Sequence, residues 1–502
     1  MLIIFIFQGI KMPCKTAFII FPNQLFNDIK AIQKAKYNHI YIVEEPIYFY
    51  DAIYKPIKPH KIKVAYLRAC MRAYYELHLK KLSNVCTYVD YASCDTNYSF
   101  IDKDVDTFVF YNPIDNDLIK KLENMSKNRN IKLDILDTPD LLLPISTLNT
   151  YYNKHKTPKH ASFYNFVKTN LSILQDTKNL DKMNRSSPPL NEPNVYKFKP
   201  KPALMKYYNE AIQYTNQNFE KHIGECENVK IYPITFTDTK RAFEAFLSTR
   251  LENFGKYEDA IMEKDAFMYH SVMSPMMNVG LILSKQIIDM TVTKYEHDKD
   301  KIPLSSFEGF VRQVIGWRCF MQSIYIFKSD EIEMSNIPNN FKTFKNYDAW
   351  YNGETGIYPF DNEVKKTLQY SYSHHIVRLM IFMNLFILCE VHPYEIYKWF
   401  MEVVSIDAYS WVMISNIYAM GYFYPNIMSK PYISSSNYVI KMSNYKKDGT
   451  WDKIWDALYH DFVGTKPSSY TFFYKRTYKN SPELHKSATE FKSKHFVDYV
   501  KK

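Results

Sequence analysis

Two adjacent histidines, His374 and His375, are the residues of this chain best suited to proton chemistry. Histidine exchanges a proton near neutral pH, so it can act as a general acid or base. On a helix the two side chains would point about 100° apart, and Arg378 would share one patch with both because it follows them by four and three residues. The alternative is a buried histidine pair bonded to the backbone, and the spacing leaves both readings open.

Other polar residues interrupt apolar segments in the second half of the chain. A polar group inside apolar packing is costly unless it has a partner, so Arg378, Asp407 and Asn416 each need a partner or a ligand. Taken singly, each is better explained by an internal ion pair or a cap.

The first third of the chain must form a different kind of structure from the rest. Five short runs rich in β-branched and aromatic residues are predicted as strands: Thr16–Phe21, Tyr37–Glu44, Val85–Tyr91, Val105–Tyr111 and Ile131–Leu136. Helical periodicity over 63–82 and 118–128 lies between them, and this alternation implies βαβ units with a parallel, Rossmann-like sheet. The chain has no G-x-G-x-x-G and no P-loop, so no dinucleotide fingerprint supports NAD or ATP.

The second part of the chain is dominated by helical periods. They predict helices over 205–224, 239–252, 256–269, 307–327, 363–390 and 393–405. Residues 178–203 are rich in Pro, Asn, Ser and Lys and read as a linker or long surface crossover. We therefore expect an α/β domain over residues 1–145, a linker or crossover over 146–204, and a large all-α domain over 205–502.

Composition bounds the partners and the compartment. The net charge of +11 fits a polyanionic partner, and residues 470–502 mix basic and aromatic side chains as a nucleic-acid surface does. Seven cysteines without a C-x-x-C pair argue against a disulfide scaffold or zinc site and for a reducing, intracellular compartment. The abundance of Lys, Asn, Ile, Tyr and Phe is typical of an AT-rich genome and suits a large DNA virus or an AT-rich microbe.

Neither apolar stretch predicts a membrane anchor. The run 376–389 contains Arg378 and Asn384 and is shorter than the roughly 20 residues of a membrane span. Residues 1–11 are apolar but lack the basic region and cleavage site of a signal peptide, so they are compatible with an extra leader before Met12.

Several ordered motifs resemble one known family. They are FGKYEDA (254–260), HSVMSPMMNVG (270–280), FEGFVRQVIGWR (307–318), YSHHIVRLM (372–380), DAYSWVMISN (407–416) and SKPYISSSNYVIKMS (429–443). Their order and spacing are similar to those of the photolyase-related branch of the photolyase/cryptochrome superfamily, the bacterial (6-4) photolyases that carry an iron–sulfur cluster. The resemblance covers about 180–460 and, more loosely, the chain from residue 16.

The resemblance implies a helical domain that encloses FAD and an α/β domain that can hold an antenna chromophore. It assigns to the cofactor His270, Ser271, Ser274, Asn278, Arg312, Gln313, Trp317, Arg378, Asp407 and Asn416. The residues 270–274 precede a helical stretch, where N–H groups and hydroxyls can receive phosphate oxygens. It also makes His374 and His375 the catalytic pair that faces the lesion. Trp350, Trp399, Trp411 and Tyr409 are candidates for an electron relay to the flavin.

The chain departs from the family where the iron–sulfur cluster should lie. Four cysteines hold a [4Fe–4S] cluster, whereas the matching positions here are Pro359, Lys446, Gly449 and the neighbourhood of Lys453. We therefore expect no cluster and no other metal. The antenna is less defined, because FPNQLF (21–26) and His60, Lys61 and Lys63 match the family's antenna segments only loosely.

The sequence thus favours a light-driven lyase that repairs UV pyrimidine dimers in DNA, with the (6-4) photoproduct as the expected lesion. We expect it to act as an intracellular monomer wherever DNA is kept, cytoplasmic or nuclear. The main alternative is a cryptochrome-like blue-light photoreceptor with the same flavin and no repair activity. A third reading is a flavoprotein or nucleic-acid-binding remnant whose photochemistry is lost.

Overall fold

The computed structural model describes residues 15–35, 37–82, 86–175, 177, 180–184, 186–333, 340–424, 427–428, 430–467 and 471–500. Residues 1–11, the leader considered above, lie outside this part of the chain. No helix within the described residues is long and apolar enough to cross a membrane.

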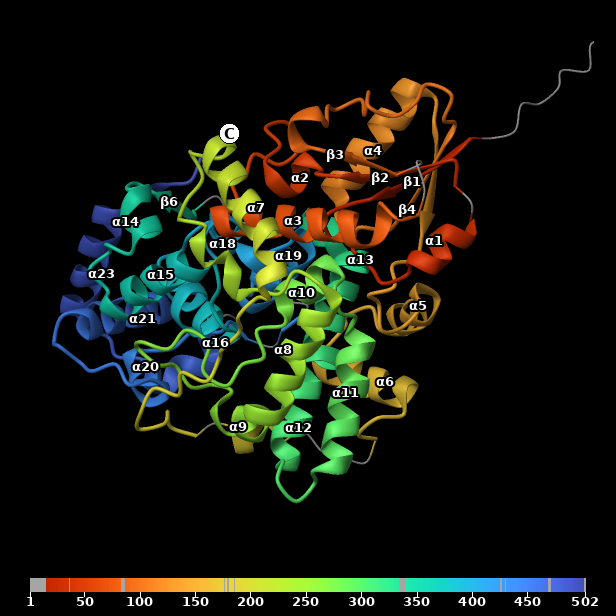
Figure 1. Cartoon of the computed structure of the whole chain (residues 1–502). Coiled ribbons are helices and arrows are strands. Elements are labelled where there is room, and N and C mark those ends of the chain that lie inside the picture. Colours follow the sequence, from red (N-terminus) through yellow and green to blue (C-terminus); the bar gives the residue numbers. More distant parts are fainter. Residues whose placement is uncertain are drawn as a thin grey trace, which may run out of the picture.

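A five-stranded parallel sheet organises the N-terminal part (Figure 1). Its strands are β1 (Thr16–Ile20), β2 (His39–Val43), β3 (Cys86–Val89), β4 (Thr107–Tyr111) and β5 (Lys132–Leu136), in the order β3–β2–β1–β4–β5. All five strands predicted from the sequence are confirmed, as is the Rossmann-like α/β class. The central strand β1 is a continuous apolar run because both of its faces are covered.

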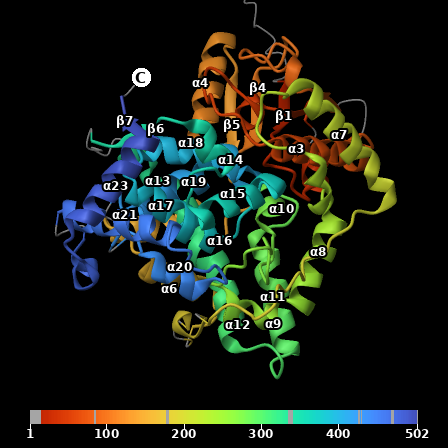
Figure 2. The same ribbon diagram turned by 90° about the vertical axis from the view of Figure 1, so that its left-hand side faces the viewer.

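Helices cover both faces of this sheet. The helix α3 (Lys61–Tyr74) and the helix α4 (Asn116–Arg129) lie on opposite sides of the strands (Figures 1 and 2), as right-handed crossovers require when the strand order reverses between β1 and β4. The shorter helices α1 (Ile29–Ala35) and α2 (Pro46–Phe49) follow β1 and β2.

The predicted crossover region contains regular structure. Helices α5 (Ile145–Lys154) and α6 (His160–Leu171) come first, and an extended stretch over 186–201 leads to the helical part. The division into three segments at 145 and 204 stays a prediction.

The rest of the chain is mostly helical, as predicted. Its longer elements are α7 (Met205–Asn218), α8 (Phe236–Thr249), α9 (Leu251–Tyr257), α10 (Ser274–Val279), α11 (Ser284–His297), α12 (Leu304–Val311), α13 (Cys319–Glu333), α14 (Tyr347–Asn352), α15 (Tyr358–Tyr370), α16 (His375–Val377), α17 (Asn384–Leu388), α18 (Pro393–Val403), α19 (Ser410–Met420), α20 (Ser436–Met442), α21 (Trp451–Thr465) and α23 (Pro482–His495). A two-stranded ribbon of β6 (Lys342–Phe344) and β7 (Phe496–Asp498) fastens the C-terminal segment to the body.

Two helix predictions are wrong in detail. Residues 258–273 form a loop instead of continuing the predicted helix 256–269, because the Asp265 carboxylate accepts the N–H groups of Phe267 and Met268 at 2.9 Å each and turns the chain. The predicted helix 363–390 is interrupted at Ser371, whose φ of 54° is left-handed. His374 precedes the new helix with extended backbone, so the two histidines do not share one helix.

Candidate functional site

A large cavity opens in the helical part of the molecule. It has about 1480 Å³ of space between its walls, including its open mouth. Its walls are mainly apolar, with a few convergent polar groups. Among the predicted cofactor residues, those on the wall are His270, Ser271, Ser274, Asn278, Gln313, Trp317, Arg378, Asp407 and Asn416.

Two wide helical turns shape the cavity wall. Residues Arg312–Arg318 and Arg378–Met383 both adopt π-helical geometry. This geometry is rare in proteins overall, and where it occurs it is often found at functional sites. The first turn lies within the motif 307–318, and the second begins in the motif 372–380 and continues three residues beyond it. The extra residue in the turn directs Gln313 and Trp317 from the first segment, and Arg378 and Leu379 from the second, to the cavity.

An ion pair fixes the charged part of the wall. Arg378 donates from one terminal nitrogen to the two carboxylate oxygens of Asp407 at 2.8 and 2.9 Å, and its Nε donates to the Ser373 carbonyl at 2.6 Å. The Ser274 hydroxyl donates to the same carboxylate, and Asn278 donates to the Asp407 carbonyl at 2.9 Å. These bonds hold three separate stretches of the chain in one geometry.

Arg318 belongs to the same wall, although the sequence reasoning missed it. It donates to Asn278 Oδ1 at 2.5 Å and to Asp140 at 2.7 Å, and its guanidinium lies 4.9 Å from the ring centre of Trp411. Asp140 belongs to the loop after β5, so this pair joins the sheet to the cavity. The final residue of the GWR motif was the available signal.

Glu258 is the second residue that the sequence reasoning missed. It lines the cavity, and its carboxylate accepts hydrogen bonds from the Gln313 and Asn184 amides, the latter at 3.0 Å. Arg312 lies behind this wall and forms ion pairs with Glu258 at 3.5 Å and with Glu308 at 3.4 Å. Arg312 is thus placed to support the wall and not to face the cavity.

The two predicted catalytic histidines occupy different positions. His375 lines the cavity, and its ring centre is 6.4 Å from that of Trp317. His374 is 2% exposed and stacks on His270, with ring centres 4.4 Å apart and an angle of 16° between the planes. Within the described residues, Nδ1 of His374 and Nε2 of His270 have no hydrogen-bond partner.

Burial keeps the stacked pair neutral. It lowers the pKa of His270 to about 3, with His375, Arg250 and Arg378 adding to the effect through their charge. Burial also lowers the pKa of His374 far below its usual range. Desolvation by the surrounding protein, with the charges of Arg378 and Arg312, lowers the pKa of His375 as well. Its side chain is exposed to the cavity, and water in the cavity limits this shift.

The candidate relay residues lie on two sides of the cavity. Trp411 is on the wall itself. Trp399 is buried behind the wall residue Phe400, with ring centres 5.3 Å apart, and its indole Nε1 donates to the Trp350 carbonyl at 3.0 Å. Tyr409 is buried in the contact between the two parts of the chain, 5.8 Å from the ring of Tyr48.

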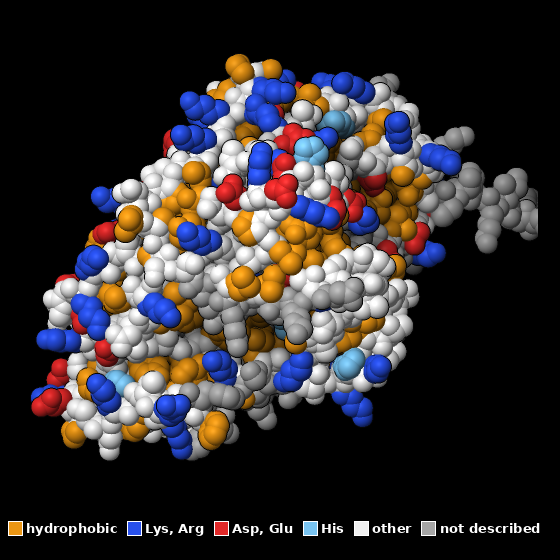
Figure 3. Space-filling view, turned by 90° about the horizontal axis from the view of Figure 1, so that it is seen from below, with side chains coloured by type: hydrophobic (Ala, Val, Ile, Leu, Met, Phe, Trp, Pro, Cys, Tyr) orange, Lys and Arg blue, Asp and Glu red, His pale blue; other side chains and the backbone are white. Residues whose placement is uncertain are grey.

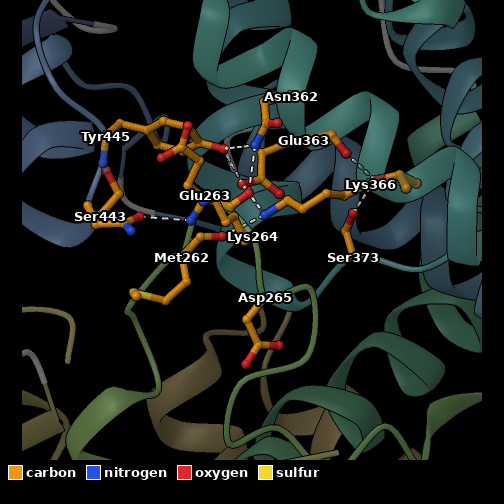
Figure 4. Close-up of polar contacts among 12 residues, drawn as sticks. Met262, Glu263, Lys264, Asp265, Asn362, Glu363, Lys366, Ser373, Ser443 and Tyr445 are labelled. Atoms are coloured by element: carbon orange, nitrogen blue, oxygen red, sulfur yellow. Dashed lines mark hydrogen bonds and ion pairs between the residues drawn. The ribbon is translucent and has the colours of Figure 1, made fainter. Parts of the chain in front are cut away.

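A polar network supports the loop that carries His270 (Figure 4). The Tyr445 hydroxyl donates to Glu363 and accepts from Asn362, both at 2.7 Å, and Asn362 also donates to the Glu263 carbonyl at 2.8 Å. Lys366 pairs with Glu363 at 2.7 Å and donates to the Met262 carbonyl at 2.6 Å. Together these bonds join α15 to the loop at residues 262–263 and to Tyr445.

This network occupies the region where the resemblance would put the cluster cysteines. Pro359 lies in the first turn of α15, and Lys446 directly follows Tyr445. No group of three His, Cys, Asp or Glu side chains in the described part of the chain is arranged to hold a metal ion.

The predicted antenna residues His60 and Lys63 lie where the α/β part of the chain contacts the helical part. His60 is fully buried and its Nε2 is 2.9 Å from the Leu368 carbonyl. Lys63 donates to the Ala408 carbonyl and, with Lys55, Tyr48 and Tyr409, lines a second and much smaller cavity. The antenna chromophore stays a prediction.

Comparisons with known proteins agree with these features. The family model of deoxyribodipyrimidine photo-lyase-related proteins matches residues 18–231. A (6-4) photolyase of Agrobacterium fabrum is 32% identical over 298 residues, which is 57% of either chain. The uncharacterized protein R855 of Acanthamoeba polyphaga mimivirus is 54% identical over 86 residues, 17% of this chain and 69% of that protein.

Two solved structures share the fold. A bacterial class III photolyase from Agrobacterium tumefaciens superposes with a TM-score of 0.53 at 17% identity, over 82% of this chain and 80% of its own. A Synechocystis cryptochrome superposes with a TM-score of 0.58 at 12% identity, over 96% and 99%. In sequence, the chain spans little more than half the length of the curated photolyase that it matches.

Proposed function

We propose that this chain, which belongs to the photolyase-related branch of the photolyase/cryptochrome superfamily, binds FAD in the cavity and repairs UV-induced pyrimidine dimers with light. The (6-4) photoproduct is the expected lesion. One observation carries the proposal: nine of the ten residues assigned to the cofactor from the sequence line a single cavity, although they come from stretches spread over 270–416.

The chemistry of the walls fits a flavin dinucleotide. Apolar side chains such as Met273, Met277 and Leu379 offer apolar packing surfaces for a ring system. The buried Nε2 of His270 lacks a partner within the described structure, and an unsatisfied buried polar atom costs about 1–3 kcal/mol. A ligand that offers a hydrogen bond there would remove that cost.

The protein's own residues would bind and orient the flavin. Arg378, locked by Asp407 and by the Ser373 carbonyl, holds its guanidinium in a fixed position on the wall, where its remaining N–H groups can donate to a ligand. Arg318 adds guanidinium N–H donors on the same wall, and the Ser274 hydroxyl, which donates to Asp407, can still accept a hydrogen bond. When bound and photoexcited in its reduced form, a flavin supplies the electron that opens the lesion.

His375 is the proposed proton-transfer residue. It is exposed to the cavity, where a flipped-out base would lie, and a histidine there can donate or accept a proton near neutral pH. His374 is buried away from the cavity, so we assign it a positioning role through its stacking on His270. This division revises the catalytic pair expected from the sequence.

Damaged DNA is the proposed partner. A lesion inside the base stack cannot reach the cavity, so it must be flipped out of the duplex. The net charge of +11 favours binding to the phosphate backbone. On the face drawn in Figure 3, hydrophobic side chains gather toward the middle, and Lys and Arg side chains are spread around them. The protein would act in whichever compartment holds the DNA.

A photoreceptor without repair activity is the second candidate. The observation that favours it is the series Phe400, Trp399 and Trp350, in which the first two rings are in contact and the Trp399 indole donates to the Trp350 carbonyl, because such a series can carry an electron without any DNA lesion. The test is the variant Trp399→Phe supplied with chemically reduced flavin. Repair under blue light by this variant would show that the relay is not needed for repair, whereas no repair by either the variant or the wild type would favour the photoreceptor.

The decisive experiment is to purify the protein, record its absorption spectrum, and illuminate it with UV-irradiated oligonucleotides under blue light. We expect a bound flavin spectrum and loss of (6-4) photoproducts. A flavin spectrum without repair of any lesion would support the photoreceptor, and the absence of flavin after reconstitution would contradict both candidates.

A further inference from the structure

The small cavity between the α/β part and the helical part of the chain has an unusual set of polar groups. Its walls come from both parts, and the polar side chains on them belong to Tyr48, Lys55, Lys63, Asp115, Tyr409 and Ser410. The cavity has room for about one water-sized molecule, so a ring system does not fit. The segment 407–410 runs between the two cavities, because Asp407 lines the large one and Ala408 the small one.

Lys63 brings a buried positive charge to this cavity. Its side chain is 2% exposed, its Nζ donates to the Ala408 carbonyl, and this nitrogen lies 4.2 Å from the ring centre of Tyr409. Burial and the charge of Lys55 lower the pKa of Lys63 to about 7, although the charges of Asp407 and Asp115 oppose this shift. A buried charge without a counter-ion is costly, so an anion beside Lys63 would stabilise its charged form.

Asp115 borders the cavity too, but its carboxylate is already engaged. Lys55 donates to one of its oxygens at 2.7 Å and Ser410 donates to the same oxygen at 2.9 Å. The other oxygen accepts the N–H groups of Asp117 and Leu118 at the start of α4. Lys55 also lies 3.7 Å from the Asp117 carboxylate. Lys55 therefore has its counter-charges, whereas Lys63 forms no ion pair with any of the described residues.

Three further groups of donors surround the same space. The hydroxyls of Tyr48 and Tyr409 are buried, and in the described part of the chain neither has a hydrogen-bond partner. Their ring centres lie 5.8 Å apart. The helix α19 begins at Ser410, on the cavity wall, without a side-chain cap, so its first N–H groups and the positive end of its dipole lie at the cavity.

We propose that this cavity binds one monovalent anion of halide size, such as chloride, between Lys63, the two tyrosine hydroxyls and the start of α19. Helix N-termini are suited to anions. A water molecule could satisfy the hydroxyls, but only an anion also supplies the counter-charge that Lys63 lacks. The ion would join the two parts of the chain, because α19 also carries Trp411 and Asn416 of the large cavity.

The test measures the unfolding equilibrium of the full-length protein in potassium chloride, potassium bromide and potassium gluconate at equal ionic strength. Gluconate is too large for the cavity, so it controls for general salt effects. We expect the halides to stabilise the fold in a saturable way. At a halide concentration 100 times the dissociation constant, the unfolding equilibrium constant should fall by about 100-fold. Neither flavin nor DNA is needed, so the result is independent of the proposed function.

Three variants connect the effect to the cavity. Lys63→Met removes the cation, keeps much of the volume and should abolish the halide effect. The matched control is Lys61→Met, on the same helix α3 but outside the cavity wall, and it should respond as the wild type does. Tyr48→Phe keeps the ring, removes one donor and should weaken halide binding by about 10-fold. It provides the test if Lys63→Met does not fold.

Anomalous scattering from crystals grown in bromide locates the ion. A bromide between Lys63 and Tyr48 in the wild type, absent from Lys63→Met, would support the site. The proposal is overturned if halides and gluconate have the same effect on the wild type, or if the halide effect is equal in the wild type and Lys63→Met. It is also overturned if bromide binds only elsewhere, and in each of these cases the cavity holds water.

Discussion

Arg378 and Asp407 are joined by two hydrogen bonds of 2.8 and 2.9 Å between one guanidinium nitrogen and the two carboxylate oxygens, and the pair forms part of the cavity wall. The residues lie 29 positions apart in the chain, on either side of α18. Each is largely buried, with side-chain exposures of 16% and 4%, so each depends on the other for its charge.

Asp407→Asn should therefore weaken both the fold and flavin binding. Removing one partner of a buried pair costs about 3–5 kcal/mol because a charge is left uncompensated, and we expect the lower end here since Arg378 keeps the Ser373 carbonyl. Chemical denaturation measures the free energy of unfolding, and the flavin-to-protein absorbance ratio measures occupancy.

Asp289→Asn is the control for that variant. It breaks the Lys285–Asp289 pair, whose side chains are 62% and 56% exposed, and exposed pairs contribute about 0–1 kcal/mol. Equal losses in the two variants would argue against a special role for the buried pair.

The two histidines should respond differently to substitution by alanine. His375→Ala should lower repair of (6-4) photoproducts by about 10²–10⁴-fold, the usual contribution of a proton-transfer residue, with little change in stability because the side chain faces the cavity. His374→Ala should lower the melting temperature, since it leaves a void beside His270. Repair rates per bound flavin and thermal melts measure both effects, and the opposite pattern would reverse the assignment.

Stability should fall as the solution is acidified below pH 6.5. Burial lowers the pKa of His60 to about 4 and that of His270 to about 3 in the folded state, whereas both stay near 6.5 in the unfolded chain. Above pH 6.5 neither state binds the proton. Between 6.5 and 4 only the unfolded state does, so each histidine removes about 1.4 kcal/mol of stability per pH unit.

Denaturation at a series of pH values checks this dependence. His60→Gln should reduce the slope between pH 6 and pH 4.5 by one histidine's share. A slope that is indifferent to His60 would mean that the residue titrates normally in the folded protein.

Tyr445→Phe should destabilise the network shown in Figure 4. The change removes the hydroxyl that bonds Glu363 and Asn362 and leaves buried polar atoms unsatisfied, at a cost of about 1–3 kcal/mol. Tyr358→Phe is the matched control: its hydroxyl bonds Glu263, but the residue is 46% exposed, so its loss should stay within about 0.5 kcal/mol. Free energies of unfolding of the two variants decide the matter.

Local sequence was sufficient to predict the sheet, and the family resemblance named nine cofactor residues that line the cavity. Each strand is a short β-rich run, and the burial of β1, β2 and β4 on both faces leaves an apolar pattern that neighbouring residues alone reveal. The motif residues Ser274, Trp317 and Asn416 were assigned to the cofactor through the resemblance, and the structure brings all three to one cavity.

What only the tertiary structure decided concerns direction and distance. Arg312 and Gln313 are adjacent in sequence, yet a π-helical turn directs Gln313 to the cavity and leaves Arg312 paired with Glu258 and Glu308 behind it. His374 and His375 were expected on one helix, but the left-handed Ser371 delays the helix start until His375, so one ring stacks on His270 and the other faces the cavity. Side-chain direction depends on backbone geometry and on partners more than a hundred residues away, which residue types and spacing do not encode; the contact of His495 with Trp350, from the far end of the chain, has the same origin.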